Sequence, residues 1–129
     1  MDHHWTDKLE LFDNVTVHHF PVHHTVECFG YNFRINNRSL GFITDTCSND
    51  SSEYAQYVDH CDLLIHECYI PDEKVKNDSK KPSGHTNSSG LIQFCKKANI
   101  SRVCFIHHNP DNYKNQILEE LKKGIPDVW

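Results

Sequence analysis

Three short apolar segments of this chain each end at residues that commonly bind metal ions or exchange protons. The segment LGFIT is followed by Asp45, CDLLI by His66 and Glu67, and RVCFI by His107 and His108. Short apolar runs that stop abruptly at polar residues are typical of buried strands. In layered α/β structures, polar groups that follow buried strands converge on one crevice at the carboxyl ends of those strands. The pattern therefore predicts an α/β fold with a metal-dependent hydrolytic site, without indicating which reaction the site performs.

The rest of the sequence predicts an antiparallel meander followed by alternating helices and strands. Alternation of apolar and polar residues indicates strands over 14–20, 28–35 and 39–44, with Pro21 ending the first and a tight turn at Asn36-Asn37. Further along, we expect helices over 53–60, 88–98 and 111–123 and strands over 62–66 and 102–106. Residues 1–13, 70–83 and 125–129 lack a clear period, and we expect them to be irregular.

Composition narrows the classes of protein that this chain can belong to. The length of 129 residues fits one domain, and a net charge of −5 without a basic block argues against a large nucleic-acid groove. No apolar run is long enough to span a membrane and no export signal is recognisable, so we expect a cytoplasmic protein whose six cysteines are reduced thiols. Eleven histidines, many of them in adjacent pairs, are unusual for a purely structural domain.

Five segments carry a resemblance to a known family. They are FPVHHTVECFGYNF, LGFITDT, DLLIHE, SGHT and VCFIHHNP. In this order and spacing they resemble the carboxyl-terminal half of metallo-β-lactamase-fold hydrolases, and most closely the branch of phosphodiesterases and the tRNA 3′-processing ribonuclease Z. The likeness extends from about residue 14 to 123. It implies half of an αββα sandwich, with a mixed sheet and covering helices.

The resemblance implies three metal ligands in this chain. His24 matches a histidine that binds the first zinc, Asp45 matches the aspartate that bridges two zinc ions, and His107 matches the last histidine ligand, on the second zinc. His23 competes with His24, which sits at the expected distance before Gly30-Tyr31, and His108 competes with His107, which directly follows its strand. Zinc is the expected metal, with manganese or iron as alternatives.

The resemblance also implies a pair of catalytic residues. Glu67 matches the glutamate of a His-Glu motif and His85 the histidine of a Gly-His-Ser/Thr motif, a pair that handles protons at the phosphodiester leaving group. The expected reaction is hydrolysis of a nucleic-acid or small-molecule phosphodiester by a hydroxide shared between two zinc ions. A thioester or lactone hydrolase of the same fold is the alternative, and the Glu67/His85 pair distinguishes the two because it is typical of the phosphodiesterase branch.

One motif of the family has no counterpart in this sequence. The His-X-His-X-Asp-His motif is missing, and the nearest fragment is Asp2-His3-His4. We therefore expect residues 1–129 to be a partial domain that has two protein ligands per metal ion and is inactive as a chain on its own. A third interpretation is a non-catalytic chain that requires a partner half or a second copy. The face that would pack on the missing sheet is expected to include Phe29, Tyr31, Phe42 and Phe105.

Overall fold

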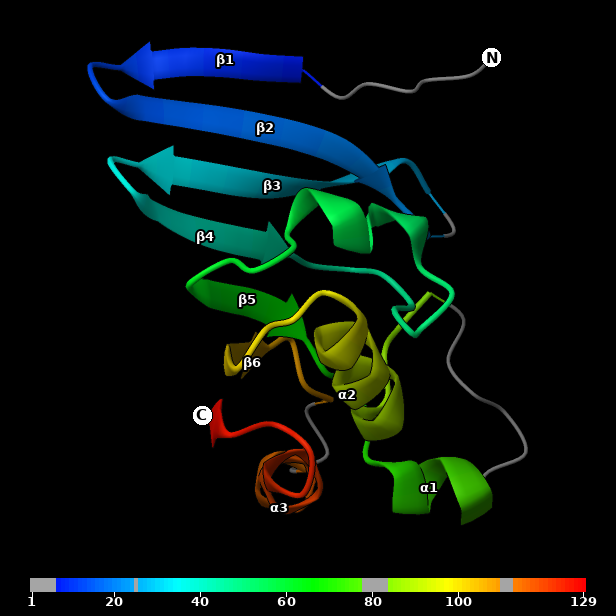
Figure 1. Ribbon diagram of the computed structural model, residues 1–129. Coiled ribbons are helices and arrows are strands. Elements are labelled where there is room, and N and C mark those ends of the chain that lie inside the picture. Colours follow the sequence, from blue (N-terminus) through cyan, green and yellow to red (C-terminus); the bar gives the residue numbers. More distant parts are fainter. Residues whose placement is uncertain (1–6, 25, 78–83, 110–112) are drawn as a thin grey trace.

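The strands of this protein lie side by side in the same order in which they occur along the chain. A computed structural model describes residues 7–24, 26–77, 84–109 and 113–129 (Figure 1). In these ranges one seven-stranded sheet has the order β1-β2-β3-β4-β5-β6-β7. The strands are β1 (Asp7–Phe12), β2 (Val15–Val22), β3 (Cys28–Ile35), β4 (Arg38–Ile43), β5 (Leu63–Glu67), β6 (Arg102–Ile106) and β7 (Asp127–Val128). Neighbours from β1 to β4 are antiparallel and those from β4 to β7 are parallel, so the predicted mixed sheet is confirmed.

Two-residue turns connect two of the three antiparallel pairs of strands. Asp13-Asn14 joins β1 to β2, and the predicted turn Asn36-Asn37 joins β3 to β4. Asn14 and Asn36 have φ angles of 66° and 55°, which is the left-handed region that asparagine tolerates better than most residues. These turns pair Phe12 with Val15 and Ile35 with Arg38, which fixes the register of each hairpin.

Pro21 does not end the second strand, contrary to the prediction. β2 continues through Pro21 to Val22, and Pro21 is paired with Phe29 of β3. The last described partner of β2 in β1 is Asp7, which lies opposite His19. Among the described residues Pro21 therefore has its strand partner on the β3 side, and a strand position that is not hydrogen-bonded on both sides tolerates a residue without an N–H.

Three segments predicted to be irregular contain regular structure. β1 forms within 1–13, α1 (Asp72–Asn77) within 70–83, and β7 within 125–129, while residues 1–6 and 78–83 lie outside the described ranges. Contacts with distant residues stabilise α1, because Asp72 accepts a hydrogen bond from the Ser89 N–H and its own N–H donates to Glu120. β1 and β7 form by pairing with the backbone of a neighbouring strand, and such pairing is hard to recognise from the apolar pattern of a short segment.

The remaining helices agree with the predicted positions, with shorter bounds. They are the 3₁₀ helix η1 (Glu53–Tyr57), α2 (Ser88–Lys97) and α3 (Lys114–Lys122). The Asn87 side chain caps the amino terminus of α2 by accepting a hydrogen bond from the Gly90 N–H. Of the residues in this helix that its apolar spacing predicts to be buried, Leu91, Cys95 and Ala98 are buried and Ile92 is partly buried.

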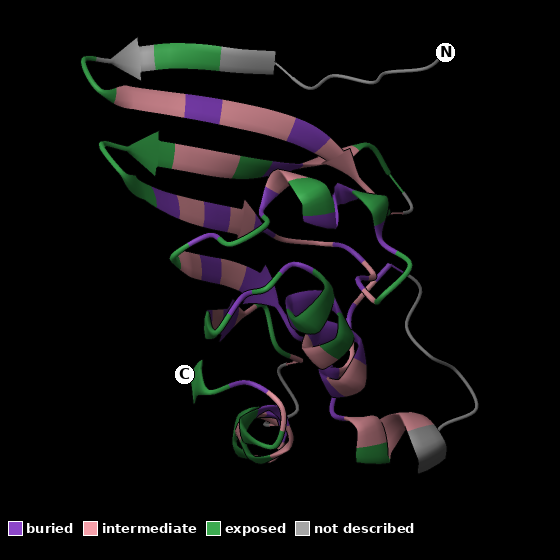
Figure 2. Ribbon diagram, viewed as in Figure 1, coloured by how far each residue is buried: buried purple, intermediate pink, exposed green. Residues whose placement is uncertain are grey.

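One face of the sheet carries the hydrophobic core (Figure 2). Alternate residues of the strands pack there against the helices, which cover this face. The strands contribute Phe20, Ile43, Leu64, Val103 and Phe105, and the helices contribute Tyr54, Ala55, Leu91, Phe94, Cys95, Ile117 and Leu121. Phe94 is completely buried at the centre of this core.

The opposite face of the sheet is also apolar but is only partly buried. Register places Tyr31 beside Phe42 and Phe42 beside Ile65, and cross-strand partners share a face. Further apolar residues on this face are Val17, Phe29, Phe33, Leu40 and Leu63. The prediction that Phe105 belongs to this face is wrong. Phe105 is 5% exposed and lies in the core, because it is paired with the buried His66, whereas its neighbour Cys104 is paired with Ile65 on the open face.

The burial of Phe94 leads to a prediction about stability. We expect Phe94→Ala to lower the free energy of unfolding by about 3–5 kcal/mol, because it would leave a cavity beneath the sheet. Ile35→Ala is the matched control, since Ile35 is 47% exposed on β3, and its cost should stay below about 1 kcal/mol. Urea unfolding followed by circular dichroism measures both, and equal losses would show that α2 is not part of a single core.

Candidate functional site

The carboxyl ends of three neighbouring parallel strands bring the candidate residues together. Glu67 is the last residue of β5, His107 directly follows β6, and Asp45 lies two residues after β4. Asp45 and His107 have φ angles of 50° and 55°, so the chain turns through the left-handed region at both positions. These conformations cost about 1–2 kcal/mol each for residues with a side chain, and such strain is found most often at functional sites.

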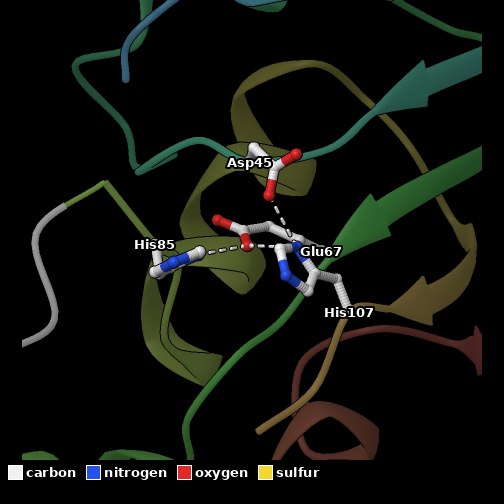
Figure 3. A group of neighbouring side chains, drawn as sticks. All are labelled: Asp45, Glu67, His85 and His107. Atoms are coloured by element: carbon white, nitrogen blue, oxygen red, sulfur yellow. Dashed lines mark hydrogen bonds and ion pairs between the residues drawn. The ribbon is translucent and has the colours of Figure 1, made fainter. Parts of the chain in front are cut away.

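Four side chains form a compact group at this edge of the sheet (Figure 3). His107 Nδ1 lies 2.8 Å from Asp45 Oδ1 and 3.5 Å from Glu67 Oε2. His85 Nδ1 lies 2.7 Å from the same Glu67 oxygen. One ligand atom from each residue lies within 4.8 Å of the others. The two contacts predicted from the sequence, Asp45 with His107 and Glu67 with His85, are therefore present.

Glu67 is fully buried at the centre of this group, and its two oxygens have different partners. Oε1 accepts hydrogen bonds from the backbone N–H groups of Thr46, at 2.9 Å, and Thr86, at 3.0 Å. Oε2 is left facing the imidazoles of His85 and His107. The peptide groups thus fix the orientation of the carboxyl group and direct one oxygen toward the histidines.

Burial changes the acidity of both members of the Glu67–His85 pair. Loss of water contact raises the pKa of Glu67 to about 8, although the N–H groups of Thr46 and Thr86 and the nearby His107 favour the charged form. Burial also lowers the pKa of His85, against the attraction of the Asp45 carboxylate. The carboxyl group becomes a weaker acid and the imidazole a weaker base, so burial favours the neutral form of both groups.

His24 lies beside this group but not within it. Its ring is 5.8 Å from that of His85, and its Nδ1 lies 2.9 Å from the carbonyl oxygen of Gly84, to which the ring N–H can donate. Gly84 has a φ angle of 81°, and a Cβ atom there would lie 2.5 Å from the His24 ring nitrogen. Glycine is therefore required both for the backbone conformation and for the close approach of this histidine.

The two histidines that compete with the predicted ligands are placed differently. The His23 side chain is exposed, and its carbonyl oxygen accepts hydrogen bonds from the Thr46 hydroxyl and the Cys47 N–H. His108 is exposed and does not belong to the group of four. The geometry thus brings His107, rather than His108, to Asp45, and His24, rather than His23, to His85.

Tyr69 was not anticipated from the sequence, and His66, which the sequence places at the end of an apolar run, lies in the core and outside the group of four. The ring of Tyr69 stacks on His85 at 4.3 Å, with 16° between the planes. His66 is completely buried beside Phe94, where loss of water contact lowers its pKa to about 4 and keeps the ring neutral. Its Nε2 contacts the Ser48 hydroxyl at 2.8 Å and its Nδ1 contacts the Glu67 carbonyl oxygen at 2.6 Å. The one sequence signal for these two residues is that they lie within two positions of Glu67, the last residue of β5.

Comparison with known proteins relates the chain to one family and one fold. The model of the β-lactamase superfamily domain matches residues 1–108. Among solved structures, the metallo-β-lactamase-fold protein YhfI from Bacillus subtilis is similar, with a TM-score of 0.77 and 19% identity over 95% of this chain and 47% of that chain. Human tRNase Z, short form, has a TM-score of 0.68 and 20% identity over 82% of this chain and 40% of that chain. A diphosphatase of the PhnP family has a TM-score of 0.69 and 21% identity over 99% of this chain and 44% of that chain.

These comparisons also indicate how much of such a protein the chain represents. It spans less than half the length of each of these three solved structures. No curated protein sequence matches it. None of the helices in the described ranges combines the length and apolarity needed to cross a membrane.

The raised pKa of Glu67 predicts how stability depends on pH. In the metal-free folded chain Glu67 keeps its proton up to a pKa of about 8, compared with the ordinary value of 4.5. Between these pH values the folded state binds more protons than the unfolded state, so the contribution of Glu67 to stability falls as pH rises. In the presence of a chelator, the free energy of unfolding of the wild type minus that of Glu67→Gln should decrease from about pH 4.5 to pH 8. Urea titrations across this range measure the difference, and a constant or rising value would contradict the assignment.

Proposed function

The chain belongs to the β-lactamase superfamily, and on that premise we propose that it is the carboxyl-terminal half of a metal-dependent phosphodiester hydrolase. One observation carries the proposal: two contacts between a carboxyl group and an imidazole lie side by side. One of them has the groups that bind metal ions, and the other has the groups that transfer protons. The first joins Asp45 to His107 and the second joins Glu67 to His85. Hydrolysis of a phosphodiester needs both functions, because negative charge develops on the phosphate oxygens while the leaving oxygen takes up a proton.

Asp45, His107 and His24 are the residues that would hold the metal. Carboxylate and imidazole are the ligands that zinc, manganese and iron accept, and the two contacting groups here are of those types. The contact between His24 and the Gly84 carbonyl supports a ligand role, because a metal-bound histidine usually donates its other ring N–H to a carbonyl or carboxylate. When bound, such ions lower the pKa of a water molecule and stabilise negative charge on phosphate oxygens. Zinc is the metal we propose, in a site for two ions.

The Glu67–His85 pair would act on the leaving group. His85 is partly exposed whereas Glu67 is fully buried, so the imidazole is the member of the pair that substrate can reach. We assign to His85 the delivery of a proton to the departing oxygen and to Glu67 its orientation and recharging through the 2.7 Å contact. Stacking on Tyr69 restrains the plane of the His85 ring during this step.

The substrate class follows from this pair and is supported by two of the similar structures. One of them is named a tRNase and the other a diphosphatase. A nucleic-acid or small-molecule phosphodiester is therefore the proposed substrate. A thioester or lactone hydrolase is less well supported, because the buried Glu67 and its contact with His85 would have no evident role in it.

A second part of the proposal concerns the open face of the sheet. Tyr31, Phe42 and Ile65 and their neighbours form an apolar surface on the side away from the helices. We propose that a second sheet, which carries the remaining metal ligands, packs on this face in the active protein. The lengths of the similar structures support it, since more than half of each lies outside the part that this chain matches.

Replacement of His85 tests the catalytic assignment. In the protein that carries both sheets, His85→Ala should lower kcat by about 10²–10⁴-fold while the zinc content is unchanged, because a proton donor is lost and no ligand is removed. His108→Ala is the matched control and should retain the wild-type kcat, since His108 is exposed and outside the group. Loss of zinc in His85→Ala would instead identify His85 as a ligand.

The chain on its own provides a test of the second sheet. We expect purified 1–129 to bind substoichiometric zinc, to lack phosphodiesterase turnover and to self-associate, because its metal ligands are incomplete and an apolar sheet face is uncovered. Zinc analysis, hydrolysis of bis(p-nitrophenyl) phosphate and analytical ultracentrifugation measure the three properties. A monomer that binds two zinc ions tightly and turns over substrate would refute this part of the proposal.

A further inference from the structure

Thr86 is a fully buried residue whose hydroxyl connects two loops of the site. The hydroxyl donates a hydrogen bond to the carbonyl oxygen of Thr46 at 2.6 Å and accepts one from the N–H of Ser48 at 2.9 Å. Thr46 and Ser48 belong to the loop that begins at Asp45, about forty residues earlier in the sequence. One side chain next to His85 therefore holds the backbone that follows Asp45.

The backbone of Thr86 closes a ring of hydrogen bonds around Glu67. Its N–H donates to Glu67 Oε1, the oxygen that also accepts from the N–H of Thr46. Thr46 is thus bound to Glu67 through its N–H and to Thr86 through its carbonyl oxygen. A shift of the Thr86 side chain would move Thr46, and with it both the Asp45 backbone and the anchor of the Glu67 carboxyl group.

We propose that Thr86 is a positioning residue, which holds Asp45 and the Glu67–His85 pair at the separation that the site needs. The inference rests on the proposed function for the roles of those three residues, but the contacts that carry it do not depend on a bound metal. The position requires a group that donates and accepts at once, and a hydroxyl does both. An aliphatic side chain of the same shape would leave a buried carbonyl and a buried amide without these hydrogen bonds, which proteins avoid.

Isosteric replacement provides the test. Thr86→Val keeps the shape and removes the hydroxyl, Thr86→Ser keeps the hydroxyl, and Thr86→Ala leaves room for a water molecule to bridge the two groups. Ser88→Ala is the matched control, since it removes another buried hydroxyl two residues away that has no hydrogen bond to the 46–48 loop. The measurements on the 129-residue chain are amide hydrogen exchange at Ser48, the carboxyl ¹³C resonance of Glu67 without metal, and the Kd for zinc.

The expected results differ between the variants. Thr86→Val should exchange the Ser48 amide at least tenfold faster, shift the Glu67 resonance and raise the zinc Kd about tenfold. Thr86→Ala should show smaller changes in the same direction and also serves if Thr86→Val is insoluble. Thr86→Ser and Ser88→Ala should remain within about twofold of the wild type in exchange rate and Kd.

Two outcomes would overturn the inference. One is that Thr86→Val and Thr86→Ala match the wild type in all three measurements. The other is that Thr86→Val lowers the urea midpoint but leaves the Glu67 resonance, the Ser48 exchange rate and the zinc Kd unchanged. Thr86 would then contribute to stability without positioning the site. If the wild-type chain binds too little zinc for a Kd, which its incomplete ligand set allows, Ser48 exchange and the Glu67 resonance in the metal-free chain decide the role of Thr86. The proposed function is tested separately, by His85→Ala in the protein that carries both sheets.

Discussion

The hydrogen bonds between two peptide N–H groups and the buried carboxyl group of Glu67 are the interaction on which the site depends. They come from Thr46 and Thr86, which lie in different loops, and they meet on one oxygen. A carboxyl group without water contact needs such donors, since an unpaired one would be costly to bury. Because Oε1 accepts the hydrogen bonds from both loops, Oε2 can contact the imidazoles of His85 and His107. The hydrogen bonds that offset the cost of burying the Glu67 carboxyl group therefore also orient its second oxygen toward the two histidines.

The change from antiparallel to parallel pairing at β4 divides the molecule into two parts with different tasks. Strands β1 to β4 form by local turns and present a broad apolar surface. Strands β4 to β6 run parallel, so their carboxyl ends lie at one edge and deliver Asp45, Glu67 and His107 to one place. The helices that connect the parallel strands cover a single face, and the buried side chains of both parts join in one core.

The sequence was most informative where a short apolar run ended at a polar residue, because burial of the strand and placement of its end follow from the same pattern. This is why the strands that carry Glu67 and His107 were located to within a residue. It was least informative where long-range contacts decide the structure. β1, α1 and β7 are stabilised by distant backbone or side-chain partners, and β2 continues through Pro21 because it pairs with β3 there. The side of β6 on which Phe105 lies, the stacking of Tyr69 and the buried His66 network likewise depend on neighbours that a single sequence does not reveal.

The left-handed backbone at Asp45 and His107 also affects which substitutions selection would favour at these two positions. Both positions would be relaxed by glycine, which adopts this conformation without strain, and glycine at either one would remove a side chain that the proposed chemistry requires. Stability and activity thus favour different residues at the same two sites. A library of variants selected only for resistance to heat or protease would therefore be expected to enrich replacements there, and the most robust members would be those that had lost the site.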